Sequence, residues 1–496
     1  MKNRYIFLFA IAISALSCTK LDEVVYDKIP GNLYPENSNQ IANLSVEAYT
    51  KLRPFADDEG WWFLAQEISS DELAGPTRGS DWYDGGKWVN MHRHTWSNDD
   101  EGVNRMWSCF WTGITTCNQV LDMMNTLPQN PALTAKKREV EVLRAFYYYV
   151  LIDNYGDAPY LTSALNAPEM PFKIKRAAIF DSLVTTVKNA LPSLKDADLK
   201  YMATRNMAYA LLTKLYLNAE VYTGTPRWAE AEMYCDSLLA SSYYNLETNF
   251  LAPFLTNNQN SREIIFAIPY DENTFQGFRL HMRTLHYQHN LRFDMPVGPW
   301  NGFAVVPTFF DTFEDADKRK EGYHIYGLQY ASTGAVILDG ETFQPLDIDP
   351  HLPALRMEAP SFTPTQIRTT GARVGKYEIK MGAKENLSNK FPLFRITDFY
   401  LIKAELRIRQ GGSGDEWINP IRTRAGVSTW SGATLEMLLA ERGRELYCEG
   451  HRRQDLIRFG MWESAWWEKL AHGPDKRTFP IPKWATDANP NLLINP

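Results

Sequence analysis

The chain has 496 residues, enough for a large apolar core, and its 52 basic and 59 acidic residues give a formal net charge of −7. The sequence has no run of Lys and Arg longer than three residues and no basic stripe to hold phosphates, so we exclude a nucleic-acid partner. The 15 Trp and 25 Tyr are more informative, because flat amphipathic rings build both carbohydrate-binding surfaces and hydrophobic cores.

Residues 1–17 have the features of an export signal. Lys2 and Arg4 precede an apolar run up to Leu16, which is too short to span a bilayer and fits the core of a signal peptide. Ser17 and Cys18 follow this run, and the arrangement is similar to a lipoprotein signal, in which this Cys becomes the lipidated first residue. An ordinary cleavable signal with an incidental Cys is the alternative. Lipidation would tie the chain to a membrane without spanning it.

Apolar residues that recur at steps of three and four predict helices along much of the chain. The predicted helices cover residues 38–53, 103–121, 140–155, 176–191, 204–222, 228–240, 397–410, 416–423 and 435–449. Thr204 is a suitable N-cap, and Gly156 and Gly450 are suitable helix ends. Because these helices follow one another in pairs, we predict a mainly helical fold, in which tetratricopeptide-like helix pairs form a right-handed superhelical scaffold.

Two stretches lack this periodicity. Residues 55–101 contain many glycines that break regular elements, so we expect a long structured loop, and its aromatic content argues against disorder. Residues 246–390 are rich in Gly and Pro, so we expect an irregular region with short strands such as 264–268. Helices return in 395–460, and residues 461–496 read as an extended tail.

Buried charges and cysteines raise separate questions. Arg144 and Asp153 lie among aromatic residues of the predicted core helix, so both need partners to offset the free energy of burial. Two cysteines of one predicted helix, eight residues apart, lie about 12 Å from each other, beyond disulfide reach. Pairing of Cys235 with Cys448 is left open, and no Cys or His spacing suggests zinc.

Acidic and basic residues alternate at helical spacing between Glu441 and Arg458. Glutamates in this run could be proposed as catalytic carboxylates. The arginines beside them keep carboxylates ionised, however, and this state suits salt bridges better than general-acid catalysis. We therefore expect a structural role for this segment.

Several motifs, in a fixed order, resemble the signature of one protein family. The run RAFYYYVLIDNYGDAPY at 144–160 resembles its core-helix signature, and Leu21-Asp22-Glu23 after the Cys resembles its mature N-terminus. The segment from Arg395 resembles its R-x-x-D-x-x-L-x-x-A-E helix, and the segment from Glu441 resembles its ER-x-x-EL-x-x-EG-x-R-x-x-DL run. The tail from Pro480 matches its closing sequence. On these motifs the chain is identified as a member of the SusD/RagB family, surface nutrient-binding lipoproteins of Bacteroidetes-like bacteria.

This resemblance implies a location, partners and a division of the chain. It implies a lipid anchor at Cys18 in the outer membrane, with the protein facing the exterior. It also implies that the protein captures oligosaccharides and caps a SusC/RagA-like TonB-dependent transporter, to which it passes them. The expected regions are the signal peptide 1–17, an N-terminal SusD-like helical region 18–245, and a C-terminal SusD/RagB region 246–496.

Residues 71–88 are the best candidate for a ligand site. Sugar recognition needs flat apolar faces against the C–H side of a pyranose, with nearby charged or amide groups that hydrogen-bond the hydroxyls. Trp82, Tyr83 and Trp88 can supply the faces, and Asp71, Arg78, Asp81 and Asp84 can supply the polar groups. Glycines in this segment let the backbone place the rings outward. The resemblance implies that the same loop contributes to the family's glycan platform.

Some of these aromatic residues could instead pack the loop onto the helices. We expect this role for Trp61, Trp62, Trp107 and Trp111. From the irregular region, Trp300 is a second candidate for ligand contact, because family members often complete the platform there. Tyr287 is a further candidate.

We predict no metal site, no cofactor and no catalytic residue. His92 with His94, and the histidines at 281, 286 and 289, lack a firm third-ligand pattern, and the acidic residues 311–317 match no complete calcium-binding loop, although incidental calcium is left open. We expect a binding protein and not an enzyme. A glycoside hydrolase with an Asp/Glu pair and a scaffold that binds nothing are the alternatives. The sequence does not identify the glycan.

Overall fold

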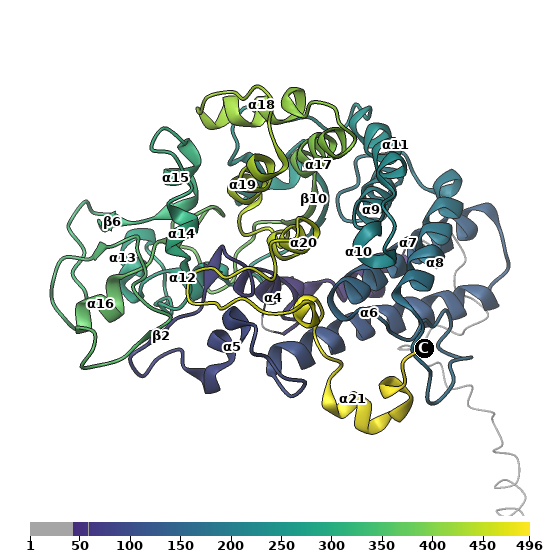
Figure 1. The fold of residues 1–496 in the computed structure, drawn as a ribbon, viewed down its shortest axis with the longest axis horizontal. Coiled ribbons are helices and arrows are strands. Elements are labelled where there is room, and N and C mark those ends of the chain that lie inside the picture. The colour runs from purple at the N-terminus through teal and green to yellow at the C-terminus, as the bar shows by residue number, and fades with distance from the viewer. Residues whose placement is uncertain (1–42, 58) are drawn as a thin grey trace, which may run out of the picture. The chain divides into compact units, whose positions relative to one another are not determined.

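Long helices at the predicted positions form the body of the protein, which the computed structural model describes for residues 43–57 and 59–496 (Figure 1). They are α6 (Glu101–Thr126), α7 (Pro131–Tyr155), α8 (Arg176–Ala190), α9 (Arg205–Leu217), α11 (Trp228–Leu239), α17 (Ile396–Arg409), α18 (Asp415–Ala425) and α19 (Leu435–Leu446). Successive helices pack on each other: α6 on α7, α7 on α8, α9 on α11, α11 on α17, and α17 on α18 and α19. The prediction of a mainly helical fold built from tetratricopeptide-like pairs is confirmed.

Residues 44–496 form one compact unit. The signal peptide 1–17, the lipidation of Cys18 and the start of the helix at 38–53 lie outside the described residues. The boundary between 245 and 246 stays a prediction. In the described part of the chain, the helices are too short or too polar to cross a membrane.

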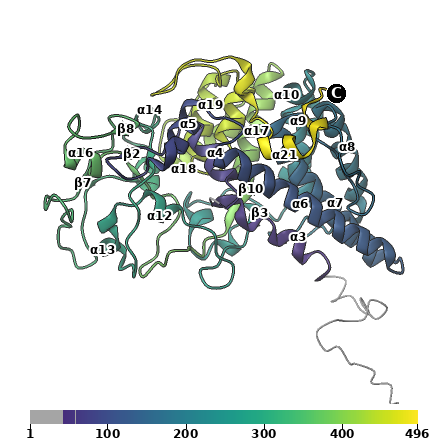
Figure 2. The ribbon, with the colours of Figure 1, turned by 90° about the horizontal axis from the view of Figure 1, so that it is seen from below.

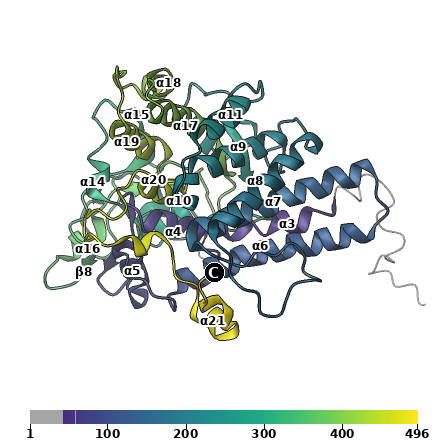
Figure 3. The same ribbon diagram turned by 45° about the vertical axis from the view of Figure 1, so that its right-hand side comes forward.

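The helix α7 is central to the packing because almost all of its second half is buried. Figure 3 shows α6 and α7 side by side. Their close approach requires Gly113, since a Cβ atom there would lie 2.3 Å from the ring of Tyr147. The helix ends at Gly156, as predicted, and this glycine has a positive φ of +73°, but its ψ of −122° differs from the left-handed helical conformation that was expected.

Arg144 and Asp153, the charged residues of α7 that lie among its aromatic residues, both have the partners that were expected. Arg144 donates from Nη1 to the side-chain oxygen of Asn118 (2.7 Å) and to the carbonyl of Thr162 (2.8 Å). Asp153 accepts hydrogen bonds from the hydroxyl of Tyr222 (2.7 Å) and from the amide of Gln454 (2.9 Å). These bonds offset the free energy of desolvation.

The described strands are short and pair two at a time. The predicted strand at 264–268 is β3 (Ile264–Ile268), which pairs antiparallel with β10 (Phe391–Arg395) in the core. The other pairs are β1 (Leu73–Ala74) with β4 (Ala304–Val305), β2 (Thr77–Arg78) with β8 (Arg356–Met357), β5 (His324–Ile325) with β9 (Arg373–Val374), and β6 (Gly327–Leu328) with β7 (Asp347–Ile348). Figure 2 shows β2, β8 and the short helix α16 (Pro364–Thr369) at one end of this unit.

The prediction that residues 55–101 lack regular elements is wrong. This segment contains α4 (Trp62–Ile68) and α5 (Lys87–Arg93). All seven residues of α4 are buried, Gln66 and Glu67 included, so the helix has no solvent-exposed face and its sequence has no amphipathic period. The first described helix, α3 (Val46–Thr50), ends before Pro54, which lies inside the 3-10 helix η1 (Arg53–Ala56) instead of acting as a stop.

Two further details depend on the tertiary structure. The helix predicted to reach residue 449 ends at Leu446, and Gly450, with a φ of +79°, follows in the next turn, where its backbone lies against the ring of Trp62. Cys235 and Cys448 are both free and buried, so they form no disulfide; Cys109 and Cys117 are also free.

The alternating charges at 441–458, on α19 and α20 (Arg452–Arg458) and the turn between them, form a buried ion-pair network with Arg395 of β10 and with Glu263, which immediately precedes β3. Arg395 lies at its centre and bonds the carboxylates of Glu263 (2.8 Å), Glu445 (3.1 Å) and Glu449 (2.6 Å). The arginines around Glu445 hold the pKa of its carboxyl at about 2 against the effect of burial. The prediction that this segment forms salt bridges is confirmed. Its ion pairs are buried between packed elements and are not exposed to solvent.

Candidate functional site

Strand pairing holds the candidate loop 71–88 against the irregular region. β1 pairs with β4 just after Phe303, and β2 pairs with β8. After β2 the chain reverses in a tight turn in which the backbones of Arg78 and Asp81 exchange hydrogen bonds of 2.9 and 3.1 Å. Gly79 makes this turn possible with a φ of +65°. The turn therefore presents residues 81–83 at the surface.

Arg78 is a structural residue of this loop and not a free ligand group, contrary to the prediction. Its side chain is buried, and the guanidinium donates to the carbonyls of Gly302 (3.1 Å), Ile367 (2.8 Å) and Thr370 (3.0 Å). Burial lowers the pKa of Arg78 to about 9, so the group remains a cation at neutral pH. The residue ties three segments of the site together.

Trp88 also faces inward, so the expectation of an outward ring is wrong. It is 1% exposed and stacks on Trp61 with ring centroids 4.7 Å apart. Its indole N–H donates to the carboxylate of Asp84 (2.8 Å), and Gly75 leaves room for its side chain. Trp88 thus forms part of the floor beneath the loop. The packing role expected for Trp61 is observed, and Trp62 and Trp107 are buried as well.

Trp82 is half-buried and held in one orientation. Its indole N–H donates to the carbonyl of Trp300 (2.7 Å), and its ring lies on Gly302, where a Cβ atom would come within 2.3 Å. Trp82 adopts a φ of +62° and Asn301 a φ of +53°, a conformation that side-chain-bearing residues rarely take. Such outliers cluster at binding sites, where the surrounding structure maintains them.

Tyr83 presents the most accessible ring of this loop, with 49% of its surface exposed. Next to it, Asp81 is exposed and accepts a short hydrogen bond from the hydroxyl of Tyr287. Burial and the hydrogen bond to Asp81 raise the pKa of Tyr287 to about 12, so its hydroxyl keeps its proton. This bond joins the predicted loop to the second predicted segment.

Two arginines that the sequence analysis did not single out lie over these rings. The guanidinium of Arg356 is 5.6 Å from the ring of Tyr83, and that of Arg368 is 4.8 Å from the ring of Tyr287. Arg368 also pairs with Asp339 (2.8 Å). Both arginines come from the irregular region, which has no periodicity or motif that could have identified them.

We call Trp82, Tyr83, Tyr287 and Trp300 the aromatic platform. Trp300 is half-buried and is backed by the guanidinium of Arg283, 5.3 Å from its ring, which itself bonds Asp57 (2.8 Å). The platform brings together aromatic faces, a carboxylate at Asp81 and the guanidinium of Arg356. Such groups can stack on a flat apolar surface and hydrogen-bond a polyol at its edge.

Asp71 does not take part in this arrangement. Its carboxylate forms a bidentate ion pair with Arg452 of α20, at 2.7 and 2.8 Å. In the described part of the chain, no hydrogen bond or ion pair connects it to the platform residues. The structure therefore assigns Asp71 to the contact between this loop and the helical body.

The close contact at Gly302 gives a testable prediction. We expect Gly302→Ala to displace the Trp82 ring and to lower the free energy of unfolding by about 1–3 kcal/mol, the range for overpacking. Urea unfolding followed by Trp fluorescence measures this change. Gly298→Ala is the matched control, because its Cβ would meet no atom closer than 3.5 Å. Equal stability of the two variants would contradict the packing described here.

Glu67 and Glu72 form a buried carboxyl pair near the loop. They are 0% and 1% exposed, and Glu67 accepts the backbone N–H of Gly450 (2.7 Å). Burial raises the pKa of Glu67 to about 7, and burial together with the charge of Glu67 raises that of Glu72. A raised carboxyl pKa is a property of general acids, but no sugar ring can reach groups with so little exposure.

The raised pKa of Glu67 predicts a pH effect on stability. The pKa of Glu67 in the folded protein lies above its ordinary value of 4.5. Its contribution to the free energy of unfolding is therefore complete below about pH 4.5 and is lost as the pH rises through 7. Glu67→Gln can still accept the backbone N–H of Gly450, but its side chain does not ionise. We expect this variant to be more stable than wild type between pH 5 and 8. The difference in the free energy of unfolding should grow by on the order of 1 kcal/mol per pH unit up to pH 7. Scanning calorimetry at constant ionic strength measures the stability difference between the variant and wild type. A difference that does not change with pH would rule out the raised pKa of Glu67.

The histidines singled out in the sequence make hydrogen bonds inside the protein. His92 faces the carbonyl of Trp467 (2.8 Å), His281 faces that of Lys384 (2.8 Å), and His286 accepts the backbone N–H of Gln288 (3.3 Å). In the residues that the structure describes, no group of three or more His, Cys, Asp or Glu side chains is arranged to hold a metal ion.

Two family models match the chain. One, described as the SusD family, matches residues 359–496, and the other, described as starch-binding associating with outer membrane, matches residues 64–217. The starch-binding protein SusD of Bacteroides thetaiotaomicron is 26% identical over 429 residues, which are 74% of this chain and 72% of that protein. A SusD-like protein P25 of Formosa agariphila is 23% identical and covers 79% of this chain and 78% of its own length.

Solved structures resemble the fold along nearly the whole chain. A SusD superfamily protein from Parabacteroides distasonis has a TM-score of 0.75 with 19% identity, over 94% of this chain and 99% of its own. The surface glycan-binding protein A from Bacteroides thetaiotaomicron, solved in complex with laminarihexaose, has a TM-score of 0.72 with 20% identity, over 91% of this chain and 97% of its own. At these identities the likeness establishes the fold.

Proposed function

This chain belongs to the SusD family, and from that premise we propose that it is a lipid-anchored outer-membrane protein that binds oligosaccharides on the aromatic platform. We further propose that it passes them to a SusC/RagA-like TonB-dependent transporter. The starch-binding and glycan-binding relatives support the ligand class. The family description of association with the outer membrane and the Cys18 motif support the location.

The observation that carries the binding proposal is the exposed ring of Tyr83 beside Asp81 and Arg356. Arg356 pairs with Glu358 (2.7 Å), so charged donors and acceptors surround the ring. The C–H face of a pyranose stacks on such a ring, while its hydroxyls bond to the carboxylate and the guanidinium. Tyr287 and Trp82 are fixed by hydrogen bonds, so little conformational entropy is lost when a ligand binds.

We propose that the protein is not an enzyme. Retaining and inverting glycosidases both need two carboxyl groups on either side of an accessible glycosidic bond. The buried position of Glu67 and Glu72 argues against this pair, and the ion pairs of Glu441 and Glu445 argue against those two acids.

A glycan panel tests the binding proposal. Starch, xylan and pectin oligosaccharides are titrated by calorimetry into the folded protein, and we expect at least one to bind without being cleaved. If all of them fail with a folded sample, the protein is a scaffold instead of a receptor. Turnover that a single carboxylate substitution abolishes would establish a hydrolase.

Deletion of the transporter tests the delivery step. Cells that lack the transporter should take up none of the bound oligosaccharide, while the purified protein keeps its affinity. Uptake that continues without the transporter would contradict the proposed partner.

A further inference from the structure

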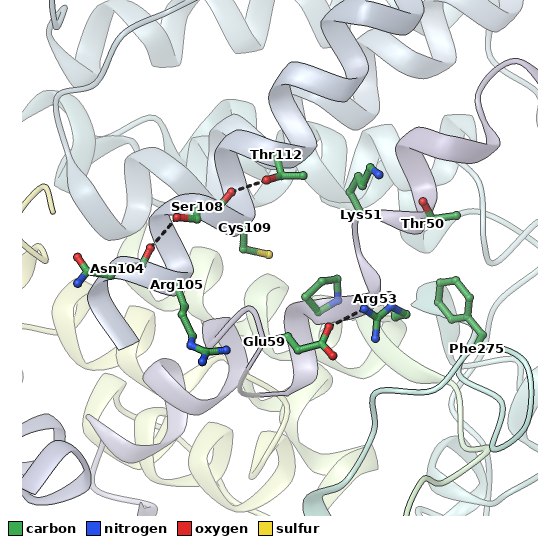
Figure 4. A pocket seen from close by; sticks show the side chains of 11 residues that line it. Thr50, Lys51, Arg53, Glu59, Asn104, Arg105, Ser108, Cys109, Thr112 and Phe275 are labelled. Atoms are coloured by element: carbon green, nitrogen blue, oxygen red, sulfur yellow. Dashed lines mark hydrogen bonds and ion pairs between the residues drawn. The ribbon is translucent and has the colours of Figure 1, made fainter. Parts of the chain in front are cut away.

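A hollow lies on the helical body, and none of the platform residues lines it. It has a volume of about 490 Å³ and lies between the start of α6, the segment that carries Arg53, Pro54 and Glu59, and the turn that carries Phe275 (Figure 4). This volume falls in the range of small-molecule sites, about 300–1,000 Å³. Figure 4 shows Ser108 and Thr112 on α6, with Arg53 and Glu59 on the segment that faces them.

Close contacts fix the shape of this hollow. A Cβ atom on Gly60 would lie 2.5 Å from the carbonyl oxygen of Pro54 and 2.9 Å from the Cys109 sulfur, so only glycine lets the segment approach α6 this closely. The hydroxyl of Tyr270 donates to the carbonyl of Arg53 (2.5 Å) and joins the segment to the third wall. The site is therefore preformed. Burial raises the pKa of the Cys109 thiol to about 12, so this group is a neutral part of the wall.

Each cation that lines the hollow has a carboxylate partner. Lys51 pairs with Glu47 (3.5 Å), Arg53 with Glu59 (2.5 Å) and Arg105 with Glu101 (2.8 Å), which also bonds Lys87 (3.0 Å). Glu59 is the carboxylate that lines the hollow itself. An anionic ligand would have to compete with carboxylates already in place, so the arrangement favours an uncharged polar ligand.

The polar groups alternate between donors and acceptors. The hydroxyls of Ser108 and Thr112 donate to carbonyls of their own helix (3.0 and 2.8 Å), so their oxygens face a ligand as acceptors. The Arg53–Glu59 pair places a planar donor next to a planar acceptor. Neighbouring hydroxyls of a polyol match such a pair, because each hydroxyl both donates and accepts.

Phe275 supplies an apolar wall. Its ring is half-buried, and its backbone exchanges two hydrogen bonds with Asp271 (3.1 and 3.2 Å), which close a tight turn. The side chain of Asp271 accepts from the backbone N–H groups of Asn273 (3.0 Å) and Thr274 (2.8 Å), and this stiffens the turn. A rigid aromatic wall opposite paired polar groups has the composition of a sugar site.

We propose that this hollow is a second carbohydrate-binding site, which takes a neutral pyranose unit of an oligosaccharide. Phe275 stacks on the sugar ring, and Arg53, Glu59 and the hydroxyls of α6 bond its hydroxyl groups. The inference shares the ligand class of the proposed function but is independent of the platform, because the two sites have no residue in common.

The test isolates the hollow by disabling the platform. Maltohexaose, laminarihexaose, xylohexaose and a galacturonic acid hexamer are titrated, by calorimetry and saturation-transfer NMR, into Tyr83→Ala/Tyr287→Ala protein. Ser108→Trp is added to fill the hollow, and Ser237→Trp is its matched control. Ser237 is an exposed serine on another helix, and its hydroxyl also donates to the carbonyl four residues earlier. Phe275→Ala removes the wall, and Phe172→Ala, at an exposed ring of another loop, is its control.

We expect at least one neutral hexasaccharide to bind the platform-disabled protein. Ser108→Trp and Phe275→Ala should weaken this binding at least tenfold, and the two controls should leave it unchanged. The proposal is overturned if no neutral hexasaccharide binds, if filling the hollow has no effect, or if only the galacturonic acid hexamer binds. If neutral binding survives the platform substitutions without loss but is abolished by Ser108→Trp, the platform proposal fails and the second site stands.

Discussion

Tyr83→Ala/Tyr287→Ala is expected to weaken binding of the best oligosaccharide by about 100-fold, while the fold is retained. Each ring contributes on the order of 1–1.5 kcal/mol of stacking to a bound sugar, and 1.4 kcal/mol corresponds to a factor of ten in affinity. Tyr83 is half exposed and Tyr287 is half-buried, so neither substitution leaves a large cavity in the core. Calorimetric titration of wild type and variant measures the effect.

Controls separate loss of the rings from loss of the fold. Tyr243→Ala/Trp484→Ala removes two exposed aromatic side chains far from the platform in sequence and should bind like wild type. Tyr287→Phe keeps the ring but removes the hydrogen bond to Asp81, and we expect an intermediate affinity. If the double variant with Ala at 83 and 287 binds as tightly as wild type, the platform is not the ligand site.

Arg395→Met is expected to lower the free energy of unfolding by about 3–5 kcal/mol, the usual result of removing one member of a buried ion pair. The side chain is fully buried and bonds Glu263, Glu445 and Glu449. After substitution these carboxylates lose their shared cation, and the remaining neighbours, Arg424 and Lys376, compensate only in part. Equilibrium urea unfolding measures the change.

Arg138→Met is the matched control. Arg138 pairs with Glu141 at 2.7 Å, but its side chain is 40% exposed, so the loss should stay below about 1 kcal/mol. Arg395→Lys keeps one charge but cannot reproduce the planar contacts, and we expect intermediate stability. Equal losses for the Met substitutions at 138 and 395 would show that burial does not set the strength of this network.

The helical frame was largely predictable from the sequence, because it depends on local periodicity. Apolar residues repeat at helical steps wherever one face of a helix is buried and the other is exposed to solvent. The helices α6, α8 and α11 follow this rule. The exception is α4, whose complete burial removes the polar face that would have revealed it. End signals such as Thr204 are equally local: its hydroxyl accepts the N–H of Met207 (3.2 Å), as an N-cap does.

The fold class, the family motifs and the position of the loop that carries Tyr83 were predictable from residue patterns, but the side chains of that loop that face outward depend on tertiary contacts. Trp82 and Trp88 are six residues apart in the same glycine-rich segment, yet one is half-buried over Gly302 and the other is buried against Trp61. Gly302 contacts Trp82 and Arg356 contacts Tyr83, although each pair is separated by more than 200 residues in the sequence. Outside helices and strands, the direction of a side chain depends on individual backbone angles and long-range packing, for which the sequence has no periodic signal.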